Sequence, residues 1–209
     1  MILTYQGGAS VKVQFGDITL SVNPISKDSK FKASRFGADV ALVSINHEDF
    51  NGVDQASLGD RQAFAVTGPG EYEIKGVFIK GFKTESKYKG EERINTVYTV
   101  NLENMNLCFL GAISSKELPS EVAESIDDID ILFVPVGAEG SLSPADASKL
   151  AVNLEPKLIV PLYFDDKAAL KAFLKEAGEE AQKPQDKLTI KKKDLEGREG
   201  DVVVLEPQA

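Results

Sequence analysis

The sequence is poorest in the side chains that bind transition metals. Its 209 residues include one histidine, His47, one cysteine, Cys108, and no tryptophan. A single cysteine cannot form a disulfide within the chain, and Cys108 lies in the apolar segment LCFLGA, so we interpret it as a small buried side chain. Any catalytic arrangement of the Ser-His-Asp or Cys-His kind would have to use His47 itself, and nothing marks Ser44 or Cys108 as an activated nucleophile.

Long apolar runs and an excess of basic charge are also missing. No segment approaches the roughly 20 apolar residues that span a bilayer, and the start, MILTYQGGAS, lacks a basic and then apolar leader. The formal charge of −9 disfavours nucleic-acid binding, which depends on lysine and arginine neutralising phosphates. We therefore expect a cytoplasmic acidic protein without a membrane role. The sequence names no partner, and a homo-oligomer remains open.

Apolar and polar residues alternate through the first half, with turn residues at short intervals, which predicts β-strands. We expect strands at 2–5, 11–15, 18–22, 40–44, 64–67, 72–74, 77–79, 95–102 and 107–110. The Val40–Ser44 run is more continuously apolar, as expected for a strand covered on both faces. A chain of 209 residues suits one large domain, so we expect a single domain over 1–209.

Helical patterns enter in the second half and alternate with further strands. We expect helices at 118–126, 143–154 and 168–177, and strands at 129–136, 158–160, 188–191 and 202–205. Ser143 is a natural N-cap, Pro144 suits the first helical position, and Asp146 places its charge near the positive end of the helix dipole. This order favours two facing sheets with outer helices over a Rossmann-type sheet.

The one histidine lies in the segment VSINHEDFNG, directly after a strand. His47 is followed two residues later by Asp49, so the loop has the character of a metal-binding loop from which most ligands are missing. Catalytic zinc needs about three protein ligands and an open position for water. A metal could be held weakly with help from Glu48 or Glu71. The simpler interpretation makes His47 a hydrogen-bonded structural residue, with Asp49 capping the turn or the helix that follows.

Several segments, in order, resemble the metallo-β-lactamase superfamily. They are YQGGAS, SVNP, LVSINHEDFNG, GPGEYEIKG, LCFLGA, ILFVPVG, SPADASKLAVNLEPK and IVPLYF. The resemblance is greatest to the bacterial metal-dependent hydrolases similar to ascorbate-6-phosphate lactonases, and it runs from about Tyr5 to Phe164. It implies an α/β fold, a four-layer αβ/βα sandwich of two mixed β-sheets with outer helices. It also implies a metal centre on the loops at one edge of the sheets.

The same resemblance implies that most ligands of that centre have been replaced. The family's Gly-His-Ala reads Gly7-Gly8-Ala9 here, and its Asp-Pro reads Asn23-Pro24. The His-x-His-x-Asp-His loop reads Ile45-Asn46-His47-Glu48-Asp49-Phe50, so His47 and Asp49 alone are kept. The Leu-Gly-Asp and Pro-x-His motifs read Leu110-Gly111-Ala112 and Pro161-Leu162-Tyr163. The vestigial cleft therefore comprises Gly8, Ile45, His47, Asp49, Phe50, Ala112 and Tyr163, and Tyr163 could either donate a hydrogen bond there or plug it.

These substitutions argue against hydrolysis, because one imidazole cannot bring the pKa of a metal-bound water toward 7. We interpret the chain as a non-catalytic relative of metal-dependent hydrolases, a pseudoenzyme with a binding or interaction role and no cofactor. We expect Ile45 and Phe50 to pack as apolar side chains in a small, dry pocket. The alternative is a working hydrolase with a rearranged or single-metal centre, zinc or manganese, around His47 and Asp49.

Overall fold

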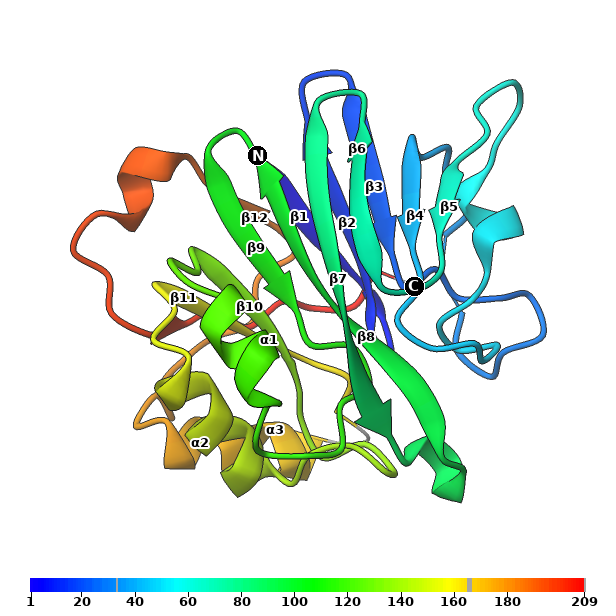
Figure 1. Cartoon of the computed structure of the whole chain (residues 1–209). Helices are drawn as coiled ribbons and strands as arrows, with labels where there is room; N and C mark the ends of the chain where they lie inside the picture. The colour runs from blue at the N-terminus through cyan, green and yellow to red at the C-terminus, as the bar shows by residue number, and fades with distance from the viewer. Residues whose placement is uncertain (33, 165–166, 209) are drawn as a thin grey trace.

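Two mixed β-sheets face each other in the computed structural model, which describes residues 1–32, 34–164 and 167–208 (Figure 1). The first sheet has six strands in the order β12-β1-β2-β3-β4-β5. Its strands are β1 Ile2–Gly7, β2 Ser10–Phe15, β3 Ile18–Val22, β4 Val40–Leu42, β5 Phe64–Val66 and β12 Leu188–Thr189. The β1–β3 meander is antiparallel, whereas β3, β4 and β5 run parallel to one another.

The second sheet has seven strands in the order β13-β11-β10-β9-β8-β7-β6. Its strands are β6 Gly70–Ile74, β7 Val77–Ser86, β8 Arg93–Leu102, β9 Met105–Phe109, β10 Ile131–Pro135, β11 Leu158–Leu162 and β13 Asp201–Val202. The sheet is antiparallel from β6 to β9 and parallel from β9 through β10 and β11 to β13. The prediction of two facing mixed sheets is therefore confirmed.

Strand bounds differ from the sequence-based expectation at several strands, most of all at β7. The expected strands 188–191 and 202–205 shorten to the two-residue strands β12 and β13. The expected short strand at 77–79 continues to Ser86, because β7 stays in register with β8 from Phe78↔Asn101 to Ser86↔Arg93. The resulting long hairpin carries the turn η2, Tyr88–Gly90, at its tip. The expected strand Val40–Ser44 ends at Leu42, where the chain enters the loop that contains His47.

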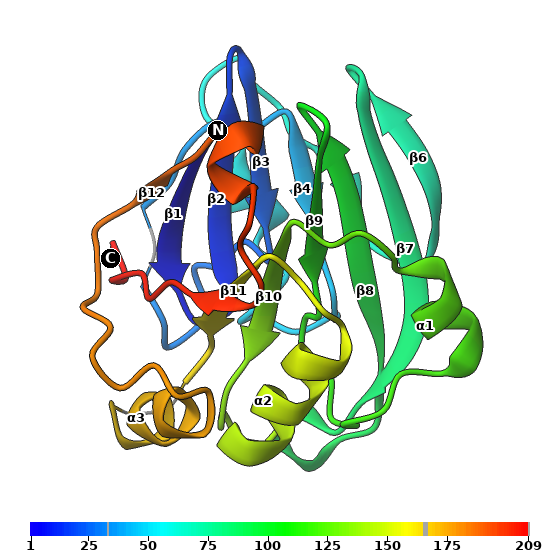
Figure 2. The same cartoon turned by 90° about the vertical axis from the view of Figure 1, so that its left-hand side faces the viewer.

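The α-helices of the described residues are α1 Ser120–Ser125, α2 Pro144–Asn153 and α3 Lys167–Glu176, and they lie against the second sheet (Figures 1 and 2). Ser143 caps α2 as predicted, with its hydroxyl accepting the Asp146 N–H at 3.2 Å. None of the described helices is long and apolar enough to cross a bilayer.

The four-layer sandwich implies helices on the outer face of each sheet, but the first sheet is covered there by a shorter element. The 3-10 turn η1, Val53–Ala56, covers it through a small cluster with Ala38 and Ala41. Alternate residues of β2 explain this, because Val11 and Val13 are fully buried between the sheets whereas Lys12 and Gln14 point outward. An outer face with polar side chains offers little apolar area to a helix.

Buried aspartates join the two sheets at the ends of strands that lie away from the His47 loop and Tyr163. Asp130, just before β10, accepts hydrogen bonds from Lys157 at 2.7 Å, from Lys192 at 2.6 Å and from the Asn106 N–H at 2.8 Å. Lys192 begins the turn η3, Lys192–Leu195, after β12, so this contact bridges the sheets.

Asp39, just before β4, makes a similar junction on the other side of the sandwich. It accepts from Lys75, in the β6–β7 turn, at 2.6 Å and from Arg61 at 2.6 Å. Burial raises the pKa of Asp39 and Asp130, but their hydrogen bonds outweigh it, and each pKa lies below its usual value. Both carboxylates therefore contribute stability in their charged form.

We expect Asp130→Asn to lower the free energy of unfolding at pH 7 by about 2 kcal/mol, because charge-assisted hydrogen bonds to a buried group are lost. The unfolded pKa of aspartate is about 3.9 and the folded pKa is lower, so this contribution is complete above about pH 4. It disappears as pH falls through the folded pKa. Urea unfolding at pH 7 and pH 3 should show the difference between wild type and variant shrinking at pH 3.

Asp128→Asn is the matched control, because Asp128 bonds the same Lys157 at 3.2 Å but its side chain is 63% exposed. Asparagine also tolerates the positive φ of 45° at this position. Its effect should stay below about 1 kcal/mol. Equal losses for the two variants would show that burial does not set the contribution of Asp130.

Candidate functional site

The His47 loop, residues 43–52, turns sharply after β4 and packs against the segment that follows β3. The N–H groups of Phe50 and Asn51 both donate to the carbonyl of His47, at 2.9 and 2.8 Å. The Ser44 N–H donates to the Asn23 side chain at 2.9 Å. Gly52 lies so close to Ile25 that a Cβ would come within 2.4 Å of its backbone, so only glycine fits there.

Asp49 is the centre of the site, with a side chain only 1% exposed. One carboxylate oxygen accepts from the Ser29 hydroxyl. The other accepts from the Tyr88 hydroxyl at 2.5 Å and from the Lys89 ammonium at 2.9 Å. Burial raises the pKa of Asp49, but these three donors outweigh it and bring the pKa below its usual value. Asp49 therefore forms an ion pair within the site. One interpretation of the sequence had Asp49 capping the turn or the helix that follows, and the Asp49 side chain makes neither contact.

His47 is held as a neutral ring. Its Nδ1 accepts the Asp49 N–H at 3.1 Å, so the proton of the neutral imidazole sits on the other nitrogen. Burial is the main cause that lowers the pKa of His47, and Lys89 and Arg93 lower it further against the opposing effect of Asp49. The 3.4 Å contact from Nδ1 to the Asp49 carboxylate is consequently not an ion pair at neutral pH.

Aromatic rings fill the space beside Asp49. We call Phe31, Phe50, Tyr88 and Tyr163 the aromatic cluster. The Tyr163 hydroxyl donates to the Tyr88 hydroxyl, which in turn donates to Asp49. Phe50 packs edge-on against both tyrosines, with 5.3 Å between ring centroids in each case. Tyr163 thus packs against the other rings of the cluster and also joins the hydrogen-bond chain that ends at Asp49.

Gly8 lies at the rim of this cluster. A Cβ at position 8 would be 3.6 Å from the Phe31 ring and 3.7 Å from the Tyr163 ring. Its φ of +54° also favours glycine over other residues. A larger side chain here would therefore be strained by its backbone conformation, and its Cβ would make ordinary contacts with two aromatic rings.

Ala112 and Ile45 belong to the buried packing around the site. Ala112 donates its N–H to the Asn95 side chain at 2.9 Å, and Ile45 is 1% exposed in the core between the sheets. A hollow next to Tyr163, bounded in part by Asn23 and Gly111, encloses about 10 Å³. That volume admits roughly one water molecule.

The structure therefore brings His47, Asp49, Phe50 and Tyr163 into one contacting group, with Gly8 at its edge. Sequence reasoning missed the donors to Asp49, namely Ser29, Tyr88 and Lys89, and the buried amide Asn95. Lys89 lies 40 residues from Asp49 in a turn of the β7–β8 hairpin, which has no apolar periodicity. No signal in a single sequence links the two positions.

The donor set does not fit the metal centre that the fold implies. In the part of the chain that the structure describes, no three histidine, cysteine, aspartate or glutamate side chains come together as a metal-binding group. Glu48 is exposed, and Glu71 faces Lys80 at 3.5 Å. The Asp49 carboxylate already accepts from three protein donors, one of them a cation.

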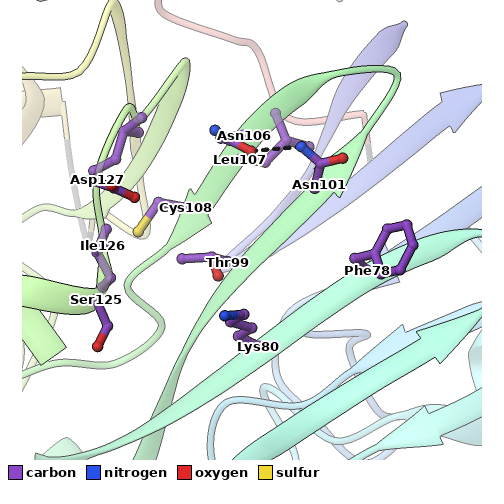
Figure 3. A pocket seen from close by; sticks show the side chains of 11 residues that line it. Phe78, Lys80, Thr99, Asn101, Asn106, Leu107, Cys108, Ser125, Ile126 and Asp127 are labelled. Atoms are coloured by element: carbon purple, nitrogen blue, oxygen red, sulfur yellow. Dashed lines mark hydrogen bonds between the residues drawn. The ribbon is translucent and has the colours of Figure 1, made fainter.

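A second hollow lies on the outer face of the second sheet, where β7–β9 meet the segment after α1 (Figure 3). Its volume is about 170 Å³, below the range of about 300–1,000 Å³ that holds most ligands. Asn101 and Asn106, paired residues of β8 and β9, both line it, and Asn101 donates to Asn106 at 2.7 Å. Burial raises the pKa of Cys108 to about 12, so the thiol there stays protonated and unreactive.

The comparisons with known proteins identify the family and support the fold described above. Residues 2–163 match the family model described as the beta-lactamase superfamily domain, so the chain belongs to this family. A metal-dependent hydrolase of the UPF0173 group from Anoxybacillus flavithermus is 27% identical, over 79% of this chain and 86% of the relative. A relative of the same group from Listeria monocytogenes serotype 4b is 25% identical with the same coverage.

Solved structures support the same fold. A Thermotoga maritima protein classed with the Zn-dependent hydrolases of the metallo-β-lactamase superfamily superposes with a TM-score of 0.78 and 26% identity, covering 98% of both chains. A metallo hydrolase from Ignicoccus hospitalis has a TM-score of 0.63 and 17% identity, over 99% of this chain and 95% of that one, which shows the fold alone. The narrower likeness to ascorbate-6-phosphate lactonases stays a prediction.

We expect His47→Ala to lower the free energy of unfolding by about 0.5–1.5 kcal/mol, or about 1–3 kcal/mol if the Asp49 N–H is left without an acceptor. His47 is the one histidine of the chain, and its folded pKa lies below the unfolded value of about 6.5. The unfolded state therefore binds the proton more readily, and this part of the stability declines as pH falls below about 6.5.

Urea unfolding of wild type and His47→Ala at pH 7.5 and pH 5.5 checks this expectation. The stability difference should be smaller at pH 5.5, because the wild type alone carries the burial penalty of protonating His47. A difference that grows at pH 5.5 would mean that the folded protein prefers the charged imidazole.

Proposed function

We propose that the chain is a non-hydrolytic member of its family that acts by binding and needs no metal. The observation that supports this most strongly is the state of Asp49, a carboxylate at a kept ligand position that accepts hydrogen bonds from Ser29, Tyr88 and Lys89. A metal ligand has to offer lone pairs to the ion, and most of those on Asp49 are directed at protein donors instead.

Hydrolysis by this fold's usual chemistry also needs space for a water molecule and a substrate next to the metal. The aromatic rings of Phe50, Tyr88 and Tyr163 pack together beside Asp49, and a hollow next to Tyr163 encloses only about 10 Å³. The kept histidine accepts a hydrogen bond from the backbone through Nδ1 and packs its ring on Tyr88, with centroids 4.9 Å apart. These features support a structural role for the site, which stabilises the fold, over a catalytic role.

We also propose that this acidic protein is cytoplasmic. Its partner is then a protein or a small molecule and not a nucleic acid. The net charge of −9 supports this choice, since phosphate backbones are repelled by acidic surfaces. The names of the metal-dependent hydrolase relatives support the alternative, a hydrolase that uses zinc or manganese bound by His47 and Asp49.

Elemental analysis and a substrate screen separate the two. Protein purified without chelators should contain well under one zinc, iron or manganese ion per chain, because the ligand set is incomplete. Phosphodiester, lactone and β-lactam substrates should show no turnover above background with wild type or His47→Ala, with zinc or manganese added. The Listeria monocytogenes relative, purified in the same way, serves as the reference for metal content and activity.

Turnover that is present in wild type and lost in His47→Ala would establish the hydrolase alternative. Stoichiometric metal that is lost in the same variant would overturn the metal-free site.

A further inference from the structure

Lys89 places a positive charge against Asp49, which stands at a ligand position of the metal centre that the family resemblance implies. Its ammonium nitrogen is 2.9 Å from Asp49 Oδ2, and its side chain is 36% exposed. We propose that this ammonium replaces the metal ion as the cation that neutralises Asp49. The proposal rests on the proposed function in one respect, because both require a wild-type site without a bound metal.

Charge balance within the site supports this role. Asp49 is 1% exposed, and a buried carboxylate without a cation is strongly unfavourable. Its two other donors, the hydroxyls of Ser29 and Tyr88, carry no charge. His47 cannot supply the charge at neutral pH, because its Nδ1 is an acceptor. Lys89 is thus the cation that holds Asp49 in its ionised form.

The backbone around Lys89 is shaped to deliver the ammonium. Lys89 has φ 54° and ψ 35°, the left-handed conformation that a non-glycine residue adopts at some cost. The two residues before Lys89 are held in place, since the Lys87 N–H donates to the Ser114 hydroxyl at 2.7 Å and the Tyr88 N–H to the Ser86 hydroxyl at 3.1 Å. Gly140 approaches so closely that a Cβ would lie 2.3 Å from the Lys87 carbonyl.

The ammonium also lies near the face of the aromatic cluster, 5.3 Å from the Tyr88 ring centroid. A cation at this distance from a tyrosine ring is attracted by the ring's negative face. Tyr88 therefore contacts the charge pair in two ways, through its hydroxyl on Asp49 and through its ring near Lys89. A divalent ion that approached Asp49 would have to displace Lys89 from both contacts.

A double-mutant cycle tests the replacement. Lys89→Met removes the charge and keeps an unbranched side chain of similar length, and Asp49→Asn removes the charge that needs neutralising. In the wild-type background Lys89→Met should lower the melting temperature by about 5 °C, since it strands a buried carboxylate. In the Asp49→Asn background the same change should lower it by no more than about 2 °C, because the partner charge is gone.

Lys87→Met is the matched control, since Lys87 is an exposed lysine in the same hairpin turn. It should leave the melting temperature within about 1 °C of wild type. MnCl₂ at millimolar concentration should not raise the melting temperature of wild type relative to Asp49→Asn, because Lys89 already occupies the cation position.

Equal effects of Lys89→Met in the two backgrounds would overturn the proposal, and so would a loss no greater than that of Lys87→Met. A manganese-dependent rise in wild type that is absent in Asp49→Asn would overturn it too. The failure of this inference can be told apart from the failure of the proposed function. Turnover in a protein that shows the Lys89–Asp49 coupling would contradict the proposed function alone. Absence of the coupling in a metal-free, inactive protein would contradict this inference alone.

Discussion

The ion pair between Lys89 and Asp49 is the interaction on which the rest of the site depends. It joins the loop after β4 in the first sheet to the tip of the β7–β8 hairpin in the second. If the Lys89 ammonium neutralises the carboxylate as proposed, the surrounding positions are free to hold apolar or aromatic side chains. The hydroxyl chain from Tyr163 through Tyr88 to Asp49 and the packing of Phe50 are consistent with that freedom.

The fold is held at its other strand ends by the same kind of contact. Asp39 and Asp130 each stand just before a strand and each accept from two cationic side chains, so the sheets are joined by buried carboxylates on both sides of the sandwich. Between them lies a continuous apolar core that includes Leu3, Val11, Leu20, Val100 and Phe133. This core and these junctions connect the two sheets.

The sequence predicted most of the fold, because alternation and turn residues depend on neighbours along the chain. Ser143 and Pro144 also marked the start of α2 correctly. The length of β7 was missed, since its extension to Ser86 depends on pairing with β8 and not on local preference. For the site, the family resemblance located His47, Asp49, Phe50 and Tyr163, but Lys89 and Tyr88 are brought to Asp49 by tertiary packing alone. Their contribution could not be read from spacing or composition.

An X-ray structure of crystals grown with zinc and manganese tests the central claim most directly, through anomalous scattering recorded at each metal's absorption edge. The account predicts no anomalous peak within coordination distance of Asp49 and His47, with the Lys89 ammonium in hydrogen-bond contact with the carboxylate. An anomalous peak bound by Asp49 and His47, with Lys89 displaced, would contradict it.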